Sequence, residues 1–446
     1  MKKRYFILVL AFVIAAVLPI VHPALLGQGV ALWTPEKPGS DNIQVLGHIP
    51  LGPRLSVADM DLEQELSRPY AYVARMVYGE EGDKGTDVID ISDPSKPKVI
   101  YKWRIEDQDL HLGNGGMDVK HFKWNDRYYF VQSFQFGQGG PDSDMGAVIV
   151  DVTDLPDTSK VKEVARLREP DNPGGFHNIF VYKHSNGRVL LIATIGAPYA
   201  AVYDLGMVVE GRVEGAMIAR IPAGDNEGGR RGYHDFYAGY HTDSAEDRFY
   251  GGGTGGYYVY NITDLEKPEL LVTLTGISGV RSGHTFTPTS DGRYAIAETE
   301  YQYAPLRIFD LEPGLSGEVE NIRRPISGWT ADWKNLTHNH EVRYPYVFVS
   351  GYLDGLQVFS MMDPRNPVTV AYYDTHVGPP NTKRNAMFNG AFGVDVRNAD
   401  GLIAISDMTT GFWTFRMEGF LGWNGEDWGM PNISSAQDWD SEGPQQ

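Results

Sequence analysis

Five short segments of the chain share one pattern of hydrophobic and polar positions. In each, a run rich in Val, Ile, Phe or Tyr ends at Asp, Asn or Ser and is followed by a turn that is rich in acidic residues and prolines. The segments are TDVIDISDPSKPKV (86–99), AVIVDVTDLPD (147–157), YYVYNITDLEKPELL (257–271), LRIFDLEP (306–313) and LQVFSMMDPRNPVTV (356–370). The β-branched run predicts a strand and the Asp and Pro residues predict a tight turn, with a further strand expected after the last proline.

A second recurring piece precedes the first one along the chain. It is a glycine-rich or polar loop, then one polar residue, then a short strand. The polar residues are Asp118, His177, His234, His284 and His338, at intervals of 59, 57, 50 and 54 residues. One more period lands near Phe392, and one period backwards lands near Arg68. The spacing predicts seven units of about four strands each, starting near residues 68, 118, 177, 234, 284, 338 and 392.

Repeats of this length predict an all-β fold, a seven-bladed β-propeller over residues 43–417. Strands run out early in the last unit, whereas residues 43–51 form an isolated strand before the first. We therefore expect this N-terminal strand to complete the last blade and close the ring, which leaves no long sheet edge exposed. The single candidate helix is the stretch 58–66. Residues 418–446 show no period and predict an irregular C-terminal tail.

The N-terminal segment has a different pattern. Lys2, Lys3 and Arg4 precede an apolar run from residue 5 to residue 21, and small residues suited to a cleavage site follow at 29–31. Residues 1–31 are therefore predicted to be a signal peptide or an uncleaved membrane anchor. In both cases the rest of the chain is expected outside the cytoplasm, periplasmic or secreted. Contact with a membrane is expected through this segment alone.

Composition and net charge exclude several kinds of site and partner. The 51 glycines, 27 prolines and 12% aromatic residues fit strands and turns. The chain has no cysteine, which excludes disulfides, thiol nucleophiles and thiolate metal sites. The formal net charge of −19 argues against a nucleic-acid partner.

The repeated turn also carries a family resemblance. The piece VIDISDPSKP and its variants resemble the LVIVD-repeat β-propeller proteins, which are mostly exported bacterial proteins. The resemblance covers about residues 68–417 and implies the propeller architecture. It implies little about activity, because most members of that family have no assigned function.

The histidines of the second repeated piece are candidate metal ligands. Because the innermost strands of successive blades start on one face of a propeller, we expect His177, His234, His284 and His338 to converge on one mouth of its central channel. Further candidate ligands are His340, Glu298, Glu300 and Asp118. Neutral imidazoles suit Fe, Cu, Zn or Mn, and a carboxylate can complete the shell. The same histidines can instead join neighbouring blades by hydrogen bonds to the backbone, and the sequence leaves both interpretations open.

Other candidate sites have less support. Tyr233, His241 and Arg231 lie in a segment rich in Tyr, His and Arg that can bind an acidic sugar and abstract a proton. Alternating Tyr and His on a strand more often indicates half-buried packing. The acidic turns can suggest calcium, but the prolines inside them favour Asx-turns.

Two classes of function remain open from the sequence. The first is an exported propeller that binds a small molecule, a glycan or a protein at the loop-rich mouth of its channel. The second is a metal-dependent enzyme, an oxidoreductase, lyase or hydrolase, that uses the ring of histidines.

Overall fold

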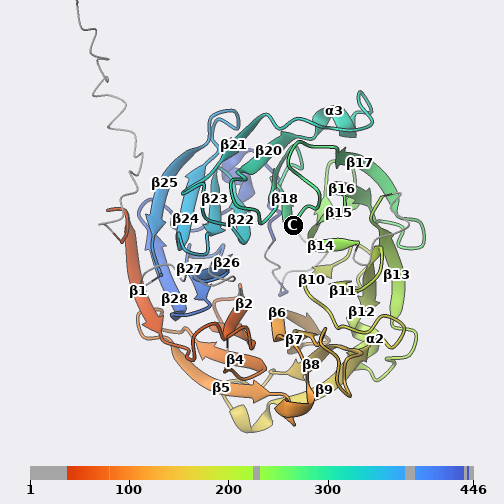
Figure 1. Cartoon of the computed structure of the whole chain (residues 1–446), viewed down its shortest axis with the longest axis vertical. Coiled ribbons are helices and arrows are strands. Elements are labelled where there is room, and N and C mark those ends of the chain that lie inside the picture. The colour runs from red at the N-terminus through yellow and green to blue at the C-terminus, as the bar shows by residue number, and fades with distance from the viewer. Residues whose placement is uncertain (1–37, 80, 225–231, 377–386, 436–438, 441–446) are drawn as a thin grey trace, which may run out of the picture. The chain divides into compact units, whose positions relative to one another are not determined.

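The computed structural model describes residues 38–79, 81–224, 232–376, 387–435 and 439–440. These described residues belong to one compact unit. In the described residues, seven four-stranded antiparallel sheets surround a common axis (Figure 1). The chain is therefore a seven-bladed β-propeller, as the repeats predict. The expected signal or anchor segment, residues 1–31, lies outside the described residues. No helix in the described part of the chain is long and apolar enough to span a membrane.

Each of the first six sheets takes four consecutive strands, from the innermost to the outermost (Figure 1). The first three sheets consist of β2 (Val57–Leu62), β3 (Tyr70–Arg75), β4 (Gly85–Asp90), β5 (Lys98–Arg104), β6 (Gly115–Trp124), β7 (Arg127–Gln135), β8 (Met145–Asp151), β9 (Lys162–Arg168), β10 (Ile179–Lys183), β11 (Val189–Thr194), β12 (Tyr199–Asp204) and β13 (Met217–Pro222). The next three consist of β14 (Tyr233–His241), β15 (Glu246–Gly253), β16 (Gly256–Asn261), β17 (Glu269–Thr275), β18 (Phe286–Pro288), β19 (Tyr294–Ala297), β20 (Leu306–Asp310), β21 (Ser327–Trp329), β22 (Asn339–Arg343), β23 (Tyr346–Ser350), β24 (Leu356–Ser360) and β25 (Val368–Tyr373).

The seventh sheet closes the ring with the two ends of the propeller. It consists of β26 (Ala391–Val396), β27 (Ile403–Asp407), β28 (Gly411–Met417) and β1 (Ile43–Ile49). β1 lies antiparallel to β28, with Ile43 opposite Met417 and Ile49 opposite Phe412. The expected closing strand is confirmed.

Helices are short and lie between or beyond the strands. They are α2 (Leu205–Val209), α3 (Glu312–Leu315) and the 3-10 turns η1 (Gln108–Leu110), η2 (Thr158–Lys160) and η3 (Gly425–Trp428).

The prediction for the first blade is wrong at its start. The blade begins with β2 at Val57, not near residue 68, and the candidate helix 58–66 is mostly this strand. Asp59 and Asp61 have low strand propensity and obscured the pattern. Both carboxylates are used inside the structure, where Asp59 accepts from the backbone N–H of Met60 and Asp61 from that of His121. The other six blades start within about three residues of the expected positions.

Sequence pattern explains how the blades pack. The middle strands are buried on both faces because each blade lies between two others; every residue of β8 is buried. Outermost strands are more exposed; in β9, four of the seven residues are exposed and Leu167 is the one that is buried. The acidic turns that follow the third strands are Asx-turns, since Oδ1 of Asp90, Asp151 and Asn261 each accepts from the N–H two residues on.

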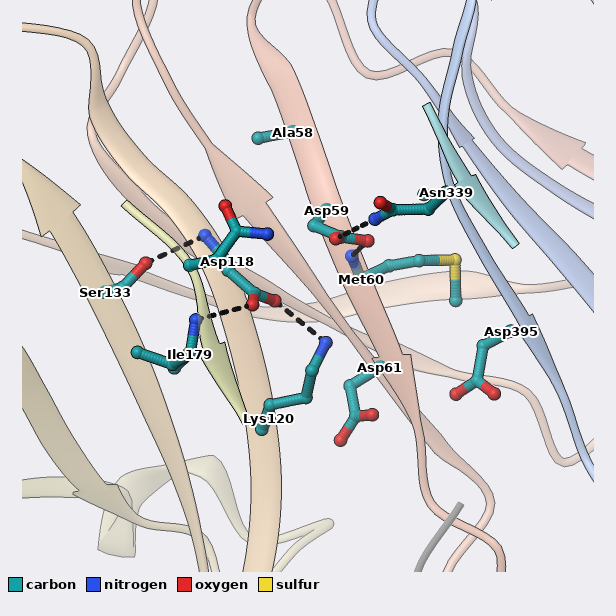
Figure 2. A network of polar contacts seen from close by, with 12 residues as sticks. Ala58, Asp59, Met60, Asp61, Asp118, Lys120, Ser133, Ile179, Asn339 and Asp395 are labelled. Carbon is teal, nitrogen blue, oxygen red and sulfur yellow. Dashed lines mark hydrogen bonds and ion pairs between the residues drawn. The ribbon is translucent and has the colours of Figure 1, made fainter. Parts of the chain in front are cut away.

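Buried aspartates join neighbouring innermost strands. Asp395 in blade seven accepts from the N–H of Leu62 in blade one (2.7 Å), and Asp61 in blade one accepts from the N–H of His121 in blade two (2.6 Å). Asp118 in blade two accepts from the N–H of Ile179 in blade three (3.0 Å), as Figure 2 shows. These carboxylates hold together the blades nearest the point of ring closure.

Beyond Met417 the described residues contain no strand, in keeping with the expected irregular tail. The tail nevertheless packs on the propeller. Ile433 is buried against the aromatic core of blade four, and Trp439 is 4% exposed. Its backbone N–H donates to Glu65.

Candidate metal-binding site

Four histidines stand at the starts of the innermost strands of blades three to six. His177, His234, His284 and His338 immediately precede Asn178, Asp235, Thr285 and Asn339. The matching positions in blades one, two and seven hold Ala58, Met117 and Phe392. One side of the ring therefore presents imidazoles and the other presents apolar side chains.

Three of the four imidazoles meet near one point. Nε2 of His177 lies 3.0 Å from Nε2 of His234, and the rings of His234 and His284 have centroids 4.0 Å apart. His234, His284 and Glu300 each offer a ligand atom, and these three atoms lie within 4.8 Å of one another. Two nitrogens bound to one tetrahedral zinc ion at about 2.0–2.1 Å would lie about 3.4 Å apart. The spacing of His234, His284 and Glu300 fits a single ion, and His177 joins the group through its contact with His234.

Hydrogen bonds at Nδ1 fix the rings. Nδ1 of His177 donates to Oε1 of Gln135 (2.7 Å), and Nδ1 of His338 donates to the carbonyl of Phe392 (2.8 Å). Nδ1 of His284 lies 2.7 Å from Oε2 of Glu298 and 2.9 Å from Oγ1 of Thr285. Metal-binding histidines typically use their second nitrogen in this way, which leaves the lone pair of Nε2 for the ion.

Charge is concentrated at His284. Burial lowers the pKa of this imidazole, but Glu298 and Glu300 raise it to about 9. Burial, followed by the positive charge of His284, lowers the pKa of His338 well below its usual value, so that this ring is neutral. In the absence of a metal, His284 is thus protonated at neutral pH and lies between two carboxylates, and an ion bound there would replace its proton.

Glu300 is held in a strained conformation by its neighbours. Its φ is 53° and that of Tyr352 is 46°, in the left-handed region that bulky residues seldom adopt. The hydroxyl of Tyr352 donates to Oε1 of Glu300 (2.7 Å), while the backbone N–H of Glu300 donates to Glu298. Oε2 of Glu300 faces Nε2 of His284 at 3.5 Å. The strain and the hydrogen bonds together aim one carboxylate oxygen at the histidines.

A cavity of about 150 Å³ opens beside these groups. We call it the histidine cavity. Its polar side holds His177, His234, His338 and Glu300. Its apolar side is formed by Met76, Tyr78, Met117, Phe388, Phe392 and Met408.

Glycine allows a close approach behind the site. A Cβ on Gly252 would lie 2.1 Å from the carbonyl oxygen of His284, which no side chain tolerates. The glycine-dense stretch 251–256 therefore allows blade four to pack closely against the backbone just before β18, and this packing fixes the position of His284.

The other candidate ligands fall into different places. The N–H of Asp118 donates to Ser133, as that of Asn178 does to Thr194 and that of Asn339 to Ser350, so Asp118 aligns with the residue after each histidine. Asp118 and His340 line a second cavity, away from the histidine cavity. Glu298 contacts Nδ1 of His284 from behind. The residue in blade two that aligns with the histidines is Met117.

The candidate catalytic residues are not gathered into one site. Tyr233 and His241 lie at opposite ends of β14, about 27 Å apart at 3.4 Å per residue. The hydroxyl of Tyr233 donates to the carbonyl of Pro222, and His241 is hydrogen-bonded to Tyr250. Burial, followed by Arg248, lowers the pKa of His241 to about 3. Arg231 lies outside the described residues.

Comparison with known proteins identifies the architecture. No protein-family model and no curated protein matches the chain. Among solved structures, it is similar to Raptor from Chaetomium thermophilum, with a TM-score of 0.53 and 11% sequence identity over 84% of this chain. The match spans 29% of that protein's length. In all, 1171 solved chains match, so this fold does not by itself select a function.

Several residues of the site escaped the sequence reasoning. The apolar wall was missed because Met76, Met408 and Phe388 lie in connecting segments outside the repeat. A shared position could have revealed Met117 and Phe392, since each precedes an innermost strand as the histidines do. The role of Tyr352 depends on its contact with Glu300, 52 residues away, which no local pattern encodes.

Proposed function

We propose that this propeller binds a divalent transition-metal ion through Nε2 of His177, His234 and His284 and the carboxylate of Glu300. The observation that carries the proposal is the convergence of these groups while Nδ1 of His177 and His284 is held by Gln135 and by Glu298 with Thr285. Without a metal, the Nε2 atoms of His177 and His234 share one hydrogen bond between blades three and four (3.0 Å), and a bound ion would replace its proton. Fe, Cu, Zn and Mn all accept such a mixed set of nitrogen and oxygen ligands.

The histidine cavity supports a role for the ion in binding or converting a small molecule. His177, His234 and Glu300 are partly exposed, so that the proposed ion would keep a face open to a ligand. Catalytic metal sites retain such an open position, whereas structural sites are closed. The wall of Met, Phe and Tyr side chains favours a ligand with an apolar part of modest size. A bound ion would act as a Lewis acid or lower the pKa of water there.

Metal analysis tests the proposal directly. Metal-free protein is titrated with Zn²⁺, Mn²⁺, Cu²⁺ and Fe²⁺ separately, and bound metal is measured by mass spectrometry after gel filtration. We expect a high-affinity site that His234→Ala and His284→Ala each abolish. His48→Ala is the matched control, because His48 stacks on Trp413 in the closing blade and its Nε2 meets the carbonyl of Thr410. Equal binding by all four proteins would refute the site.

We also propose that the chain is exported and belongs to the LVIVD-repeat propellers. The basic start and apolar run of residues 1–31 support export. The repeated Asp-Pro turn, which follows the third strand of several blades, supports the family relation. Mass spectrometry of the protein from the cell envelope or medium tests export, since cleavage near Ala31 would shorten the chain.

A further inference from the structure

A second cavity, which we call the acidic cavity, follows the histidine cavity along the innermost strands. It measures about 80 Å³, room for several water molecules. Six carboxyl groups line it: Asp59, Asp61, Asp118, Asp235, Glu341 and Asp395. Lys120 and His121 are the basic residues facing them from β6.

Four of these carboxylates already have partners that account for them. Asp118 accepts from Nζ of Lys120 (2.8 Å), and Asp61 forms an ion pair with His121. Glu341 forms an ion pair with Arg343 (2.9 Å). Asp395 accepts from the backbone N–H groups of Leu62 and Val396.

Asp59 and Asp235, like Asp395, form no ion pair within the described residues, and each is held instead by a neutral side chain of another blade. They belong to blades one and four. Asp59 accepts from the side-chain amide of Asn339 (2.7 Å), as Figure 2 shows, and Asp235 from the hydroxyl of Thr285 (3.2 Å). Oγ1 of Thr285 also lies 3.2 Å from Oδ1 of Asn339, so these four side chains form one continuous polar path. Two buried carboxylates are thus held by neutral groups alone, at a high desolvation cost.

His340 supplies an independent sign of a missing ligand. This side chain lines the acidic cavity, is 3% exposed, and has no hydrogen-bond partner at either ring nitrogen. The carbonyl of Ile296 is near enough to influence its pKa, but not in hydrogen-bonding geometry. Buried imidazoles without any partner are rare in folded proteins, and this one lines the same cavity as the carboxyl groups, which is consistent with a missing ligand.

We propose that the acidic cavity is a second cation site, in which Asp59, Asp235 and His340 hold a divalent cation that keeps part of its hydration shell. Among the described residues, His234, His284 and Glu300 are the one set that brings three such ligand atoms within 4.8 Å. The ion in the acidic cavity is therefore held partly through water, as hard cations commonly are. Its oxygen-rich ligand set with one nitrogen suits Mn²⁺.

The C-terminal tail contributes to the wall of this cavity. Ser435 and Trp439 line it. The hydroxyl of Ser435 is hydrogen-bonded to Glu341, and Nη1 of Arg343 donates to that hydroxyl (3.1 Å). The two cavities share no lining residue.

Manganese binding tests the inference. Metal-free protein is titrated with Mn²⁺ and the free ion is followed by electron paramagnetic resonance. The wild type is expected to bind a second equivalent that the Asp59→Asn/His340→Gln variant loses and the His234→Ala/His284→Ala variant keeps. Asp126→Asn, at a side chain that is 99% exposed, is the control and should bind as the wild type does.

Each failure has its own meaning. A loss of Mn²⁺ only in the His234→Ala/His284→Ala variant overturns the second site and leaves the first. If the wild type binds one equivalent, which the His234→Ala/His284→Ala variant keeps and the Asp59→Asn/His340→Gln variant loses, the acidic cavity is supported and the histidine site does not bind Mn²⁺. The separate titrations with Zn²⁺, Cu²⁺ and Fe²⁺ then decide the proposed function. If the Asp59→Asn/His340→Gln variant does not fold, the His234→Ala/His284→Ala protein is used. Its bound Mn²⁺ should show nitrogen hyperfine coupling that a further His340→Gln removes, and absence of that coupling overturns the role of His340.

Discussion

Replacing Tyr352 with Phe isolates the contribution of one hydrogen bond to the proposed metal site. The hydroxyl of Tyr352 donates to Oε1 of Glu300 at 2.7 Å, and the tyrosine is 1% exposed. Its ring packs on Phe388 and His338, and Phe preserves these contacts. Since both side chains occupy a φ of 46° equally badly, the substitution adds no backbone strain. The variant therefore differs from the wild type in lacking the hydrogen bond that orients the carboxylate of Glu300.

The expected magnitude follows from the buried, charged acceptor. A hydrogen bond to a charged group contributes about 1.5–3 kcal/mol, and loss of a group that orients a metal ligand weakens binding about 10- to 100-fold. We expect the Kd for Zn²⁺ to rise by this factor in Tyr352→Phe. Competition with a chromophoric chelator at pH 8 measures it, with circular dichroism and thermal melting to verify the fold.

Tyr78→Phe is the matched control. Tyr78 lines the same histidine cavity, and its hydroxyl makes no hydrogen bond within the described residues. The control should bind Zn²⁺ like the wild type. An unchanged Kd in a well-folded Tyr352→Phe protein would mean that Glu300 is not a ligand fixed by this tyrosine. An equal loss in both variants would assign the effect to the cavity wall.

Three further outcomes are expected. Burial raises the pKa of Asp354 from 3.8 to about 7, so its contribution to the free energy of unfolding falls as pH rises from about 4 to 7. In urea unfolding, the free energy of unfolding of Asp354→Asn should therefore rise relative to that of the wild type by about 2.5 kcal/mol between pH 5 and pH 8. A difference between the two proteins that does not depend on pH would contradict this. Gly252→Ala, whose Cβ would meet the His284 carbonyl at 2.1 Å, should lower both the melting temperature and metal content, whereas loss of neither would contradict the packing argument. Deletion of residues 1–50 removes β1 and should leave β28 as an open edge, giving oligomers by light scattering; a monodisperse monomer would show that closure is dispensable.

The sequence predicted the architecture because each blade carries its own copy of the same local signals. In most blades the third strand is followed directly by its Asx-turn, as at Asp90 and Asp151, so both signals lie in one short segment. The number of blades then follows from the spacing of these segments along the chain. The first blade was misplaced because Asp59 and Asp61 serve contacts between strands that are remote in the chain. Strand propensity depends on local sequence and does not reflect contacts between strands that are distant in the chain.

The histidines could be located from the sequence, but their chemistry could not. His177, His234, His284 and His338 occupy equivalent positions, yet they differ in their partners. Gln135, Glu298 and the carbonyl of Phe392 come from three different elements, and each sets the orientation of one ring. Asp118 was grouped with the histidines because an alignment on polar residues passes over Met117, the apolar residue that precedes it. The shared N–H bonds to Ser133, Thr194 and Ser350 correct this by one position.

The pairing of β1 with β28 has a consequence for the time order of folding. Ile43 contacts Met417, so the first strand of the propeller emerges from the ribosome long before its partner exists. Sequence-distant contacts of this kind form late and slowly. Until Gly411–Met417 are available, β1 has no strand to pair with. Only a full-length chain can close the ring. A chain interrupted before residue 411 retains β1 with unpaired backbone hydrogen-bonding groups, which chaperones and quality-control proteases can recognise.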